Sequence, residues 1–431
     1  MTVRYGVAPG HPARTSIYVR TGSVRRGSPS RAGMTRPPLP SPTRNPPDPR
    51  MKRTYVALAA LIALASCGDD STPSSVTADD GPVRIGHLVS GDRISYRNGA
   101  ALAVDEVNAG GGLLGRPVEL VSEVGIEEAA VAAQVAERMI VTDGVVAIIG
   151  PNRSTHAVEV GPVAQRRGVP MVTTAATNPS VTEAGDLVFM AAYTDRFQGG
   201  VMARFAREAL GVTTAAFLTE RGDVYAEGIA EFFALSFREL GGTVIAEEFY
   251  DAGATDFSAQ LARISAGVPE ILFLPGFPTE VALITRAARA LPLADADGGQ
   301  TVLAGGDTWD NPELLENEAA EVEGGYFTTH FSPDTDEEAA RAFVAAYQAA
   351  HGTLPSGGDG VNYDAVRIFV EAAERAGTLE ADAVRRQIAA TEDYAGATRI
   401  ARYNEDRHPT KSVVIMSVRD GAKTFFRQVD P

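Results

Sequence analysis

The hydrophobic positions of this chain alternate between short apolar runs and amphipathic stretches from residue 83 onward. Residues 83–89 predict a strand, and the stretch after them has the i, i+3, i+4, i+7 spacing of a helix at Ala100, Ala103, Val104 and Val107. Further strands separated by helical stretches are expected at residues 118–122, 145–149, 169–173, 215–218, 243–248, 271–274 and 302–304. This alternation predicts an α/β fold with two parallel sheets, each covered by helices on both faces.

The pattern changes after residue 325. Long helices are expected at residues 337–351, 363–376 and 381–391, and hairpin-like strands at 398–402, 412–418 and 424–429.

Two of the apolar runs end in polar loops about twenty residues apart. The run at residues 145–149 leads into residues 150–155, and the run at 169–173 leads into 174–179. Parallel strands joined by one helix have their carboxyl ends at the same sheet edge, where open α/β folds bind ligands. Ser154 or Thr155 can cap the helix between the two strands, and such a helix start offers N–H donors to an anion. A small carboxylate is the expected ligand.

The first 66 residues differ from the rest. Residues 1–50 are rich in Arg, Pro, Ser and Gly and are expected to be disordered or a mis-assigned gene start. Residues 51–66 have the order of a secretory signal, and Leu64-Ala65-Ser66-Cys67 resembles a bacterial lipobox. We therefore expect cleavage before Cys67, a lipid on its sulfur and a flexible tether over residues 67–81. The alternative is a long cytoplasmic arm before an internal signal.

Charge narrows the class of partner. Residues 1–66 hold 11 of the 39 Lys and Arg and one of the 55 Asp and Glu, so the processed chain has 28 basic and 54 acidic residues and a net charge of −26. This excess of acid opposes binding to nucleic acid or anionic lipid, so membrane attachment is expected through the lipid on Cys67. Cys67 is the only cysteine, so no disulfide is expected.

Several motifs in a fixed order resemble one family. The segments Ser90-Gly91 through Tyr96, Glu106-Val107-Asn108-Ala109-Gly110, Pro170 to Pro179 and Tyr363-Asp364-Ala365 are similar to those of type I periplasmic substrate-binding proteins of the leucine/isoleucine/valine-binding branch. The resemblance implies two Rossmann-like lobes joined by three crossing segments, with a ligand cleft between them that closes on a hinge. Lobe 1 would hold residues 82–193 and 329–397, and lobe 2 residues 194–328 and 398–431.

The resemblance also implies site residues. Ser154 and Thr177 match the hydroxyls that hold the ligand carboxylate, with Thr155 and Ala176 beside them, and the Ala175 carbonyl matches the acceptor for the ligand ammonium. Asp307 matches the acidic partner of the ammonium, where the family has Glu. Tyr225 matches a tyrosine that closes over the ligand. Tyr96, Phe277 and Trp309 are expected at the mouth or wall of the pocket, while Arg153 and Glu280 are weaker candidates.

The expected function is an extracytoplasmic solute-binding lipoprotein, periplasmic or on the outer cell surface. It would bind a small, branched-chain type amino acid as a monomer and deliver it to the permease subunits of an ABC importer. Alternatives are a ligand-sensing lipoprotein with the same cleft, or urea, amide or aromatic-acid ligands. A hydrolase would need a nucleophile outside known motifs, because no Gly-x-Ser-x-Gly, phosphate-binding loop or His-Glu-x-x-His occurs. No cofactor, metal or catalytic residue is expected.

Overall fold

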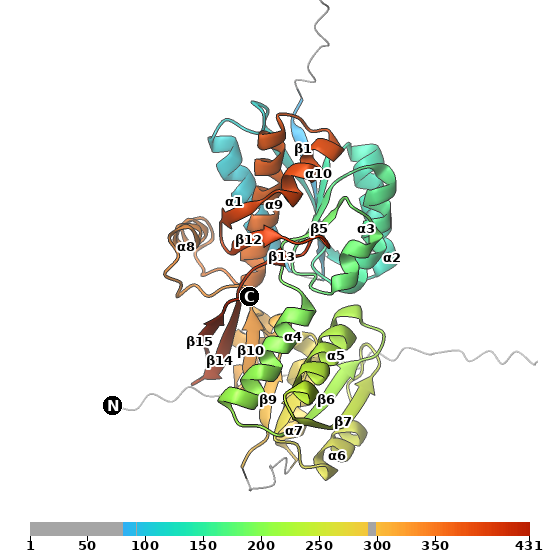
Figure 1. The fold of residues 1–431 in the computed structure, drawn as a ribbon, viewed down its shortest axis with the longest axis vertical. Helices are drawn as coiled ribbons and strands as arrows, with labels where there is room; N and C mark the ends of the chain where they lie inside the picture. Colours follow the sequence, from blue (N-terminus) through green and yellow to red (C-terminus); the bar gives the residue numbers. More distant parts are fainter. Residues whose placement is uncertain (1–80, 92, 292–298) are drawn as a thin grey trace, which may run out of the picture. The chain divides into compact units, whose positions relative to one another are not determined.

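The computed structural model describes residues 81–91, 93–291 and 299–431. The expected disordered start, the signal peptide and Cys67 lie outside these residues. Within them the fold is α/β, as expected, and is built on two main sheets and one small one (Figure 1).

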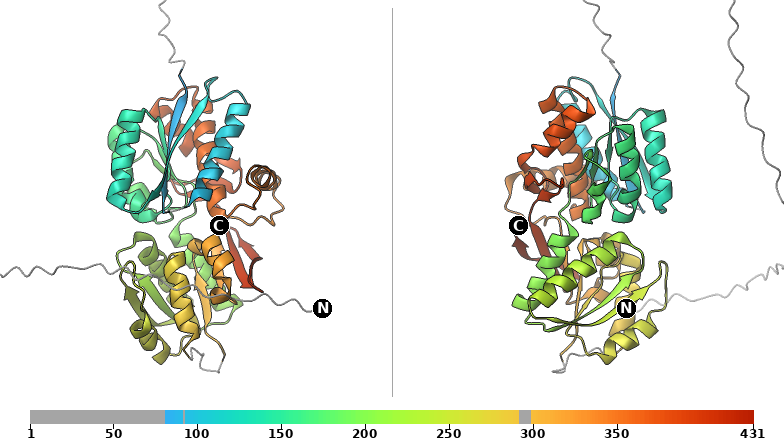
Figure 2. Two further views of the ribbon diagram at one scale, coloured as in Figure 1. Left: turned by 180° about the vertical axis from the view of Figure 1, so that it is seen from behind. Right: turned by 45° about the vertical axis from the view of Figure 1, so that its right-hand side comes forward.

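The first lobe is built on a five-stranded parallel sheet of order β2-β1-β3-β4-β5. The strands are β1 (Val83–Ser90), β2 (Val118–Ile126), β3 (Ala147–Ile149), β4 (Met171–Thr173) and β5 (Val188–Met190). Its helices are α1 (Ile94–Ala109), α2 (Ala129–Arg138) with η1 (Met139–Asp143), α3 (Ser154–Arg167), η2 (Pro179–Ala184), α8 (Glu338–His351), α9 (Gly357–Ala376) and α10 (Ala381–Ala389). One core cluster lies under α1, α8, α9 and α10 and another under α2 and α3, so helices cover both faces of the sheet (Figure 2).

The second lobe is built on a seven-stranded sheet of order β15-β14-β10-β9-β8-β6-β7. The strands are β6 (Thr214–Glu220), β7 (Thr243–Tyr250), β8 (Ile271–Phe273), β9 (Val302–Gly305), β10 (Tyr326–Thr329), β14 (Val413–Arg419) and β15 (Ala422–Val429). Its helices are α4 (Asp195–Arg204) with η3 (Phe205–Ala209), α5 (Val224–Glu239), α6 (Ser258–Ala266), α7 (Pro278–Arg289), η4 (Asp307–Trp309), η5 (Glu313–Asn317) and η6 (Ala319–Val322). Helices α4 and α5 cover one core cluster, and α6 and α7 cover another.

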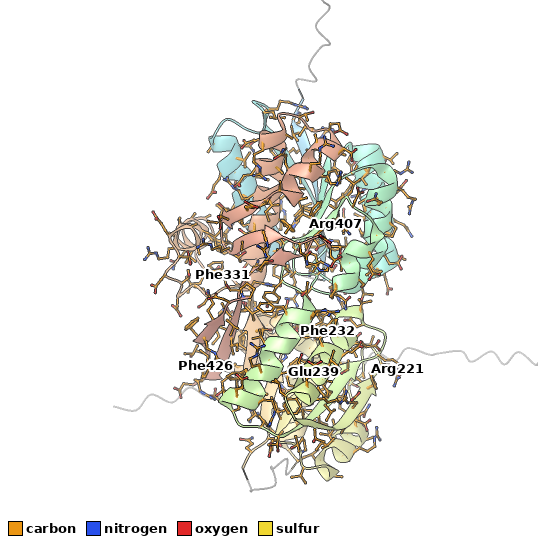
Figure 3. The ribbon with its side chains drawn as sticks, viewed as in Figure 1. Arg221, Phe232, Glu239, Phe331, Arg407 and Phe426 are labelled. Carbon is orange, nitrogen blue, oxygen red and sulfur yellow. The ribbon has the colours of Figure 1, made fainter. Side chains whose placement is uncertain are left out.

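This second sheet is mixed, because the hairpin expected at residues 412–418 and 424–429 joins the parallel strands. Strand β14 pairs antiparallel with both β10 and β15, so the terminal hairpin extends a parallel core. Phe426 on β15, labelled in Figure 3, packs edge-on against Phe205 and Tyr326, with ring centroids 5.2 and 5.6 Å away, which fixes the hairpin on η3. Strands β5 and β10 were not predicted, because each follows only short 3-10 or π-helical segments, so the strand–helix alternation does not indicate them.

A small third sheet bears on the last expected lobe boundary. Strands β11 (Glu392–Ala395), β12 (Arg399–Tyr403) and β13 (Pro409–Thr410) form a small separate sheet. Ile400 and Tyr403 belong to the first lobe's core cluster, and the Tyr403 hydroxyl donates to the Met190 carbonyl at 2.8 Å. Arg407, labelled in Figure 3, donates to the Val188 carbonyl. We therefore propose that the third crossing lies near Lys411, not between residues 397 and 398.

A buried carboxylate on α9 fixes this small sheet to the first lobe. Asp364 accepts hydrogen bonds from the Tyr394 hydroxyl (2.7 Å), the Ala397 N–H (2.8 Å), and both the N–H and the hydroxyl of Thr398. Lys411 donates to the same Thr398 hydroxyl at 2.7 Å and to the Ala191 carbonyl at 2.9 Å. Burial raises the pKa of Asp364 and lowers that of Lys411 to about 8. The network connects α9, the small sheet and two crossing segments.

We expect Tyr394→Phe to lower the free energy of unfolding by about 1.5–3 kcal/mol, the usual contribution of a hydrogen bond to a charged group. Asp364→Asn should lower the free energy of unfolding by more. In either orientation of the new amide, its NH₂ group faces two of the four donors. Urea unfolding followed by circular dichroism measures both. Tyr363→Phe is the matched control, since Tyr363 donates to the less buried Glu106 carboxylate. A larger loss for Tyr363→Phe than for Tyr394→Phe would contradict this assignment.

Candidate functional site

A cavity of about 390 Å³ lies where loops from both lobes meet. From the first lobe it is lined by residues after β1, β2, β3 and β4, and from the second by the loops after β8 and β9. These are the carboxyl ends of parallel strands, the edge at which open α/β folds bind ligands. The volume falls at the lower end of the range for small-molecule sites, about 300–1,000 Å³.

Asp307 brings a buried carboxylate to the cavity. It follows β9 directly and is 9% exposed. One carboxylate oxygen accepts a hydrogen bond from Gln198 Nε2 at 3.0 Å, and the other lies 3.3 Å from His330 Nε2. Burial and then the charge of Asp307 raise the pKa values of the Tyr193 and Tyr225 hydroxyls. This end of the cavity is therefore a negative environment that favours a cation.

Gln198 connects Asp307 to a second buried aspartate. Its Nε2 also donates to Asp195 Oδ1 at 2.7 Å, and its Oε1 accepts from the Thr328 hydroxyl at 2.8 Å. Burial raises the pKa of Asp195 well above its usual value. Asp195 starts α4, directly after the expected lobe boundary at residues 193 and 194, so the network joins the candidate site to that boundary.

Several buried polar atoms near these crossings are unsatisfied. Within the described ranges, the hydroxyls of Thr173 and Thr174 have no hydrogen-bond partner. Those of Thr177 and Tyr193 have none of normal geometry, although they lie near Asp195 and Thr328 respectively. An unpaired buried polar group costs about 1–3 kcal/mol, so such groups are rare unless a ligand or water meets them. These hydroxyls therefore favour polar contacts at the strand ends behind the cavity.

The two loops expected to hold the ligand carboxylate do lie together. The Ser154 hydroxyl accepts the N–H groups of Thr177 and Asn178, both at 3.2 Å. The expectation that Ser154 or Thr155 caps α3 is wrong, since Arg153 holds the N-cap position and no side chain caps the helix. Ser154 and Thr177 are buried and do not line the cavity.

The other expected residues divide into two groups. Ala175, Tyr96, Phe277 and Asp307 line the cavity. Tyr225 is buried beside it, with its hydroxyl 3.4 Å from Thr308 Oγ1, whereas Ala176 lies in the first lobe's core. The prediction of a Trp309 wall is wrong, because Trp309 is fully buried in the second lobe and donates its indole N–H to the Leu274 carbonyl at 3.1 Å.

Sequence reasoning missed Arg93 and Asn152 and underrated Arg153, all of which line the cavity. Each follows a strand at the same sheet edge as the expected residues, which was the available signal. Their partners were not visible: Asn152 is bonded to the backbone of Ser90, and the Arg153 guanidinium lies 3.9 Å from the centroid of the Phe277 ring.

Asp223 connects the two lobes beside the cavity. Its Oδ1 accepts the Ala226 N–H at 2.9 Å and so caps α5, while its Oδ2 accepts from the Thr155 hydroxyl at 2.9 Å. The Thr155 hydroxyl in turn accepts the Val224 N–H, and Asn178 Nδ2 donates to the Val224 carbonyl at 2.8 Å. Thr155 therefore joins the lobes in this conformation and does not contact the cavity.

The described residues hold neither a clustered metal site nor a membrane-spanning helix. No cluster of three or more His, Cys, Asp or Glu side chains among them has the geometry of a metal site. None of the described helices is both long and apolar enough to cross a membrane.

The chain is similar to solute-binding proteins over both lobes. Residues 87–423 match the family model described as periplasmic binding protein. The Leu/Ile/Val-binding protein BraC3 of Rhizobium johnstonii is 30% identical over 333 residues, which cover 76% of this chain and 84% of the relative. The leucine-binding protein LivK of Thermotoga maritima has 33% identity and a TM-score of 0.75, covering 81% of this chain and 99% of that one. LivJ of Streptococcus pneumoniae, solved with isoleucine, has 28% identity and a TM-score of 0.73, covering 81% and 100%.

We expect Asp223→Ala to lower the free energy of unfolding by about 1 kcal/mol, because it removes the N-cap of α5. Thr155→Val should change it by no more than about 0.5 kcal/mol, since it removes only the contact between lobes. Both variants should raise the fraction of open molecules, seen as a larger radius of gyration in small-angle X-ray scattering. Equal destabilisation by the two variants, measured by urea unfolding, would show that the cap contributes nothing.

Proposed function

Because the chain belongs to the periplasmic binding protein family, we propose that it is the extracytoplasmic solute-binding lipoprotein of an ABC importer and that its ligand is a small amino acid. The family consists of substrate-binding proteins of transporters and not of enzymes, and its members work outside the cytoplasm with permease subunits. The choice of an amino acid and the lipid anchor are our proposals.

The buried Asp307 carboxylate is the observation that carries the choice of ligand. A buried charge is costly unless a partner of opposite charge meets it. Among the described residues, His330 is the only basic side chain within 4.0 Å of the Asp307 carboxylate. A ligand ammonium reaching Asp307 and the Ala175 carbonyl would supply the missing positive charge.

The ligand carboxylate would bind at the junction of the loops after β3 and β4. In our proposal it is held by the Ser154 and Thr177 hydroxyls and by the N–H groups of Thr177 and Asn178, which now bond to Ser154. Charge-assisted hydrogen bonds are stronger than neutral ones, so a carboxylate can replace the Ser154 hydroxyl as their acceptor. Tyr225, Tyr96 and Phe277 would enclose the bound molecule.

Ligand binding would act by closing the lobes. Contacts that the ligand makes to both lobes exist only in the closed form, so binding shifts the population toward it. The hydrogen bonds between Val224, at the start of α5, and the side chains of Asn178 and Thr155 then stabilise the closed state further. The closed complex is the form that the permease would recognise.

A thermal-shift panel of amino acids, simple carboxylates and amides identifies the ligand, because a molecule that binds only the native state raises the unfolding midpoint. For the best amino acid, Asp307→Asn should weaken binding about tenfold or more, since a hydrogen bond to a charged group contributes about 1.5–3 kcal/mol. The same variant should leave binding of the acid without the amino group nearly unchanged. Isothermal titration calorimetry measures both.

Glu313→Gln is the matched control for Asp307→Asn. Glu313 also lines the cavity but is exposed, so its replacement should change the affinity less than about threefold. If Asp307→Asn weakens binding of the amino acid and of the simple acid equally, Asp307 does not bind the ligand ammonium.

The lipid anchor is tested separately. We expect Cys67→Ser to abolish fatty acylation, because its sulfur is the proposed attachment atom of the lipid. Ser66→Ala keeps a small residue before the cleavage site and should leave the protein acylated. Labelling with a radioactive fatty acid gives the readout, and acylation of Cys67→Ser would overturn the proposal.

A further inference from the structure

The cavity offers little contact to an aliphatic side chain. Its apolar lining consists of Ala175, the rings of Tyr96 and Phe277, and the prolines Pro278 and Pro312. Among the described lining residues, none is Val, Leu, Ile or Met. Affinity for an aliphatic group depends on the apolar area that it buries, about 25 cal/mol per Å², so this lining is poorly suited to a branched-chain residue.

The charged lining residues differ in their exposure. Glu127 and Glu313 are exposed to solvent, whereas Arg93 and Arg153 are half-buried. Solvent weakens the influence of the exposed acids, while a partly desolvated guanidinium needs an anionic partner. The lining therefore presents two partly desolvated cations in addition to the Asp307 carboxylate.

Arg153 already has partners in the second lobe. Its Nη2 lies 3.7 Å from Asp223 Oδ2, and its guanidinium lies over the Phe277 ring. Arg93 is different. It donates to the Tyr96 hydroxyl at 3.2 Å and lies 5.4 Å from the centroid of that ring, and it has no ion pair within the described ranges. Most of its five N–H donors remain available, and their planar fork matches the geometry of a carboxylate.

We propose that Arg93 binds a carboxylate on the side chain of the ligand, so that the cavity selects an acidic amino acid over a branched-chain one. This inference rests on the proposed function, which places the α-ammonium at Asp307. Arg93 is at the N-cap of α1 in the first lobe and Asp307 follows β9 in the second, so two lining charges of opposite sign come from different lobes. An amino acid with a carboxylate side chain carries a matching second negative charge.

The wild-type experiment is a calorimetric titration with glutamate, glutamine and leucine at low and moderate salt. Glutamate should bind about tenfold or more tightly than glutamine, its neutral isostere, and more tightly than leucine. Leucine binding as tightly as glutamate would overturn the inference and leave the proposed function intact. If none of these α-amino acids binds, both the inference and the proposed function are wrong. Titration with simple carboxylates and amides then identifies the class of ligand that the cavity binds.

Variants of Arg93 assign the role to this residue. Arg93→Leu should reduce the affinity for glutamate about tenfold or more and leave that for leucine unchanged or higher, while Arg93→Lys should retain part of the preference because the charge remains. Arg97→Leu removes the same charge one turn along α1 from an exposed position outside the cavity lining and should change neither affinity. Equal losses for glutamate and leucine in Arg93→Leu would place the α-carboxylate on Arg93 and contradict the proposal. Thermal unfolding of the ligand-free variants verifies that each is folded.

Discussion

The Gln198 side chain holds two buried aspartates in one hydrogen-bond network, and the candidate site depends on it. One amide nitrogen donates to Asp195, at the start of α4, and to Asp307, at the end of β9. Without that donor two carboxylates would lie in the protein interior with fewer partners, which is costly. Gln198 thus positions a carboxylate at the cavity and joins it to the first crossing segment.

The same principle recurs at the third crossing. Asp364 receives four hydrogen bonds from the small sheet, and Lys411 shares one of its partners. Buried polar networks of this kind have few alternative arrangements, because every change leaves a donor or acceptor unpaired. Asp195 and Asp364 therefore each hold a segment close to an expected crossing in a hydrogen-bond network.

Much of the fold could be predicted from the sequence, and the reasons differ among elements. The long helices have clear periodicity, and the predicted strands are apolar runs that alternate with them, whereas β5 and β10 follow only short 3-10 or π-helical segments and break that alternation. Residues 399–410 could not be assigned to a lobe, because the contact between Tyr403 and Met190 joins positions more than two hundred residues apart.

The candidate site was predictable to the level of loops but not of side-chain direction. The sheet-edge rule placed the loops after β3 and β4 together, and the family resemblance placed the loop after β9 across the cleft from them. Asp307, Ala175 and Phe277 line the cavity. It could not tell that Trp309, two positions beyond Asp307 in η4, turns into the core, or that Thr155 contacts Asp223. Those outcomes depend on the local turn and on the opposite lobe, neither of which is encoded in spacing.

The double role of Asp223 has a spectroscopic consequence. One of its oxygens holds the backbone amide of Ala226 while the other faces the first lobe, so any opening of the lobes changes the charge next to that amide. The nitrogen and proton chemical shifts of a single α5 residue should therefore follow domain movement in solution, with no attached label and no perturbation of the binding pocket.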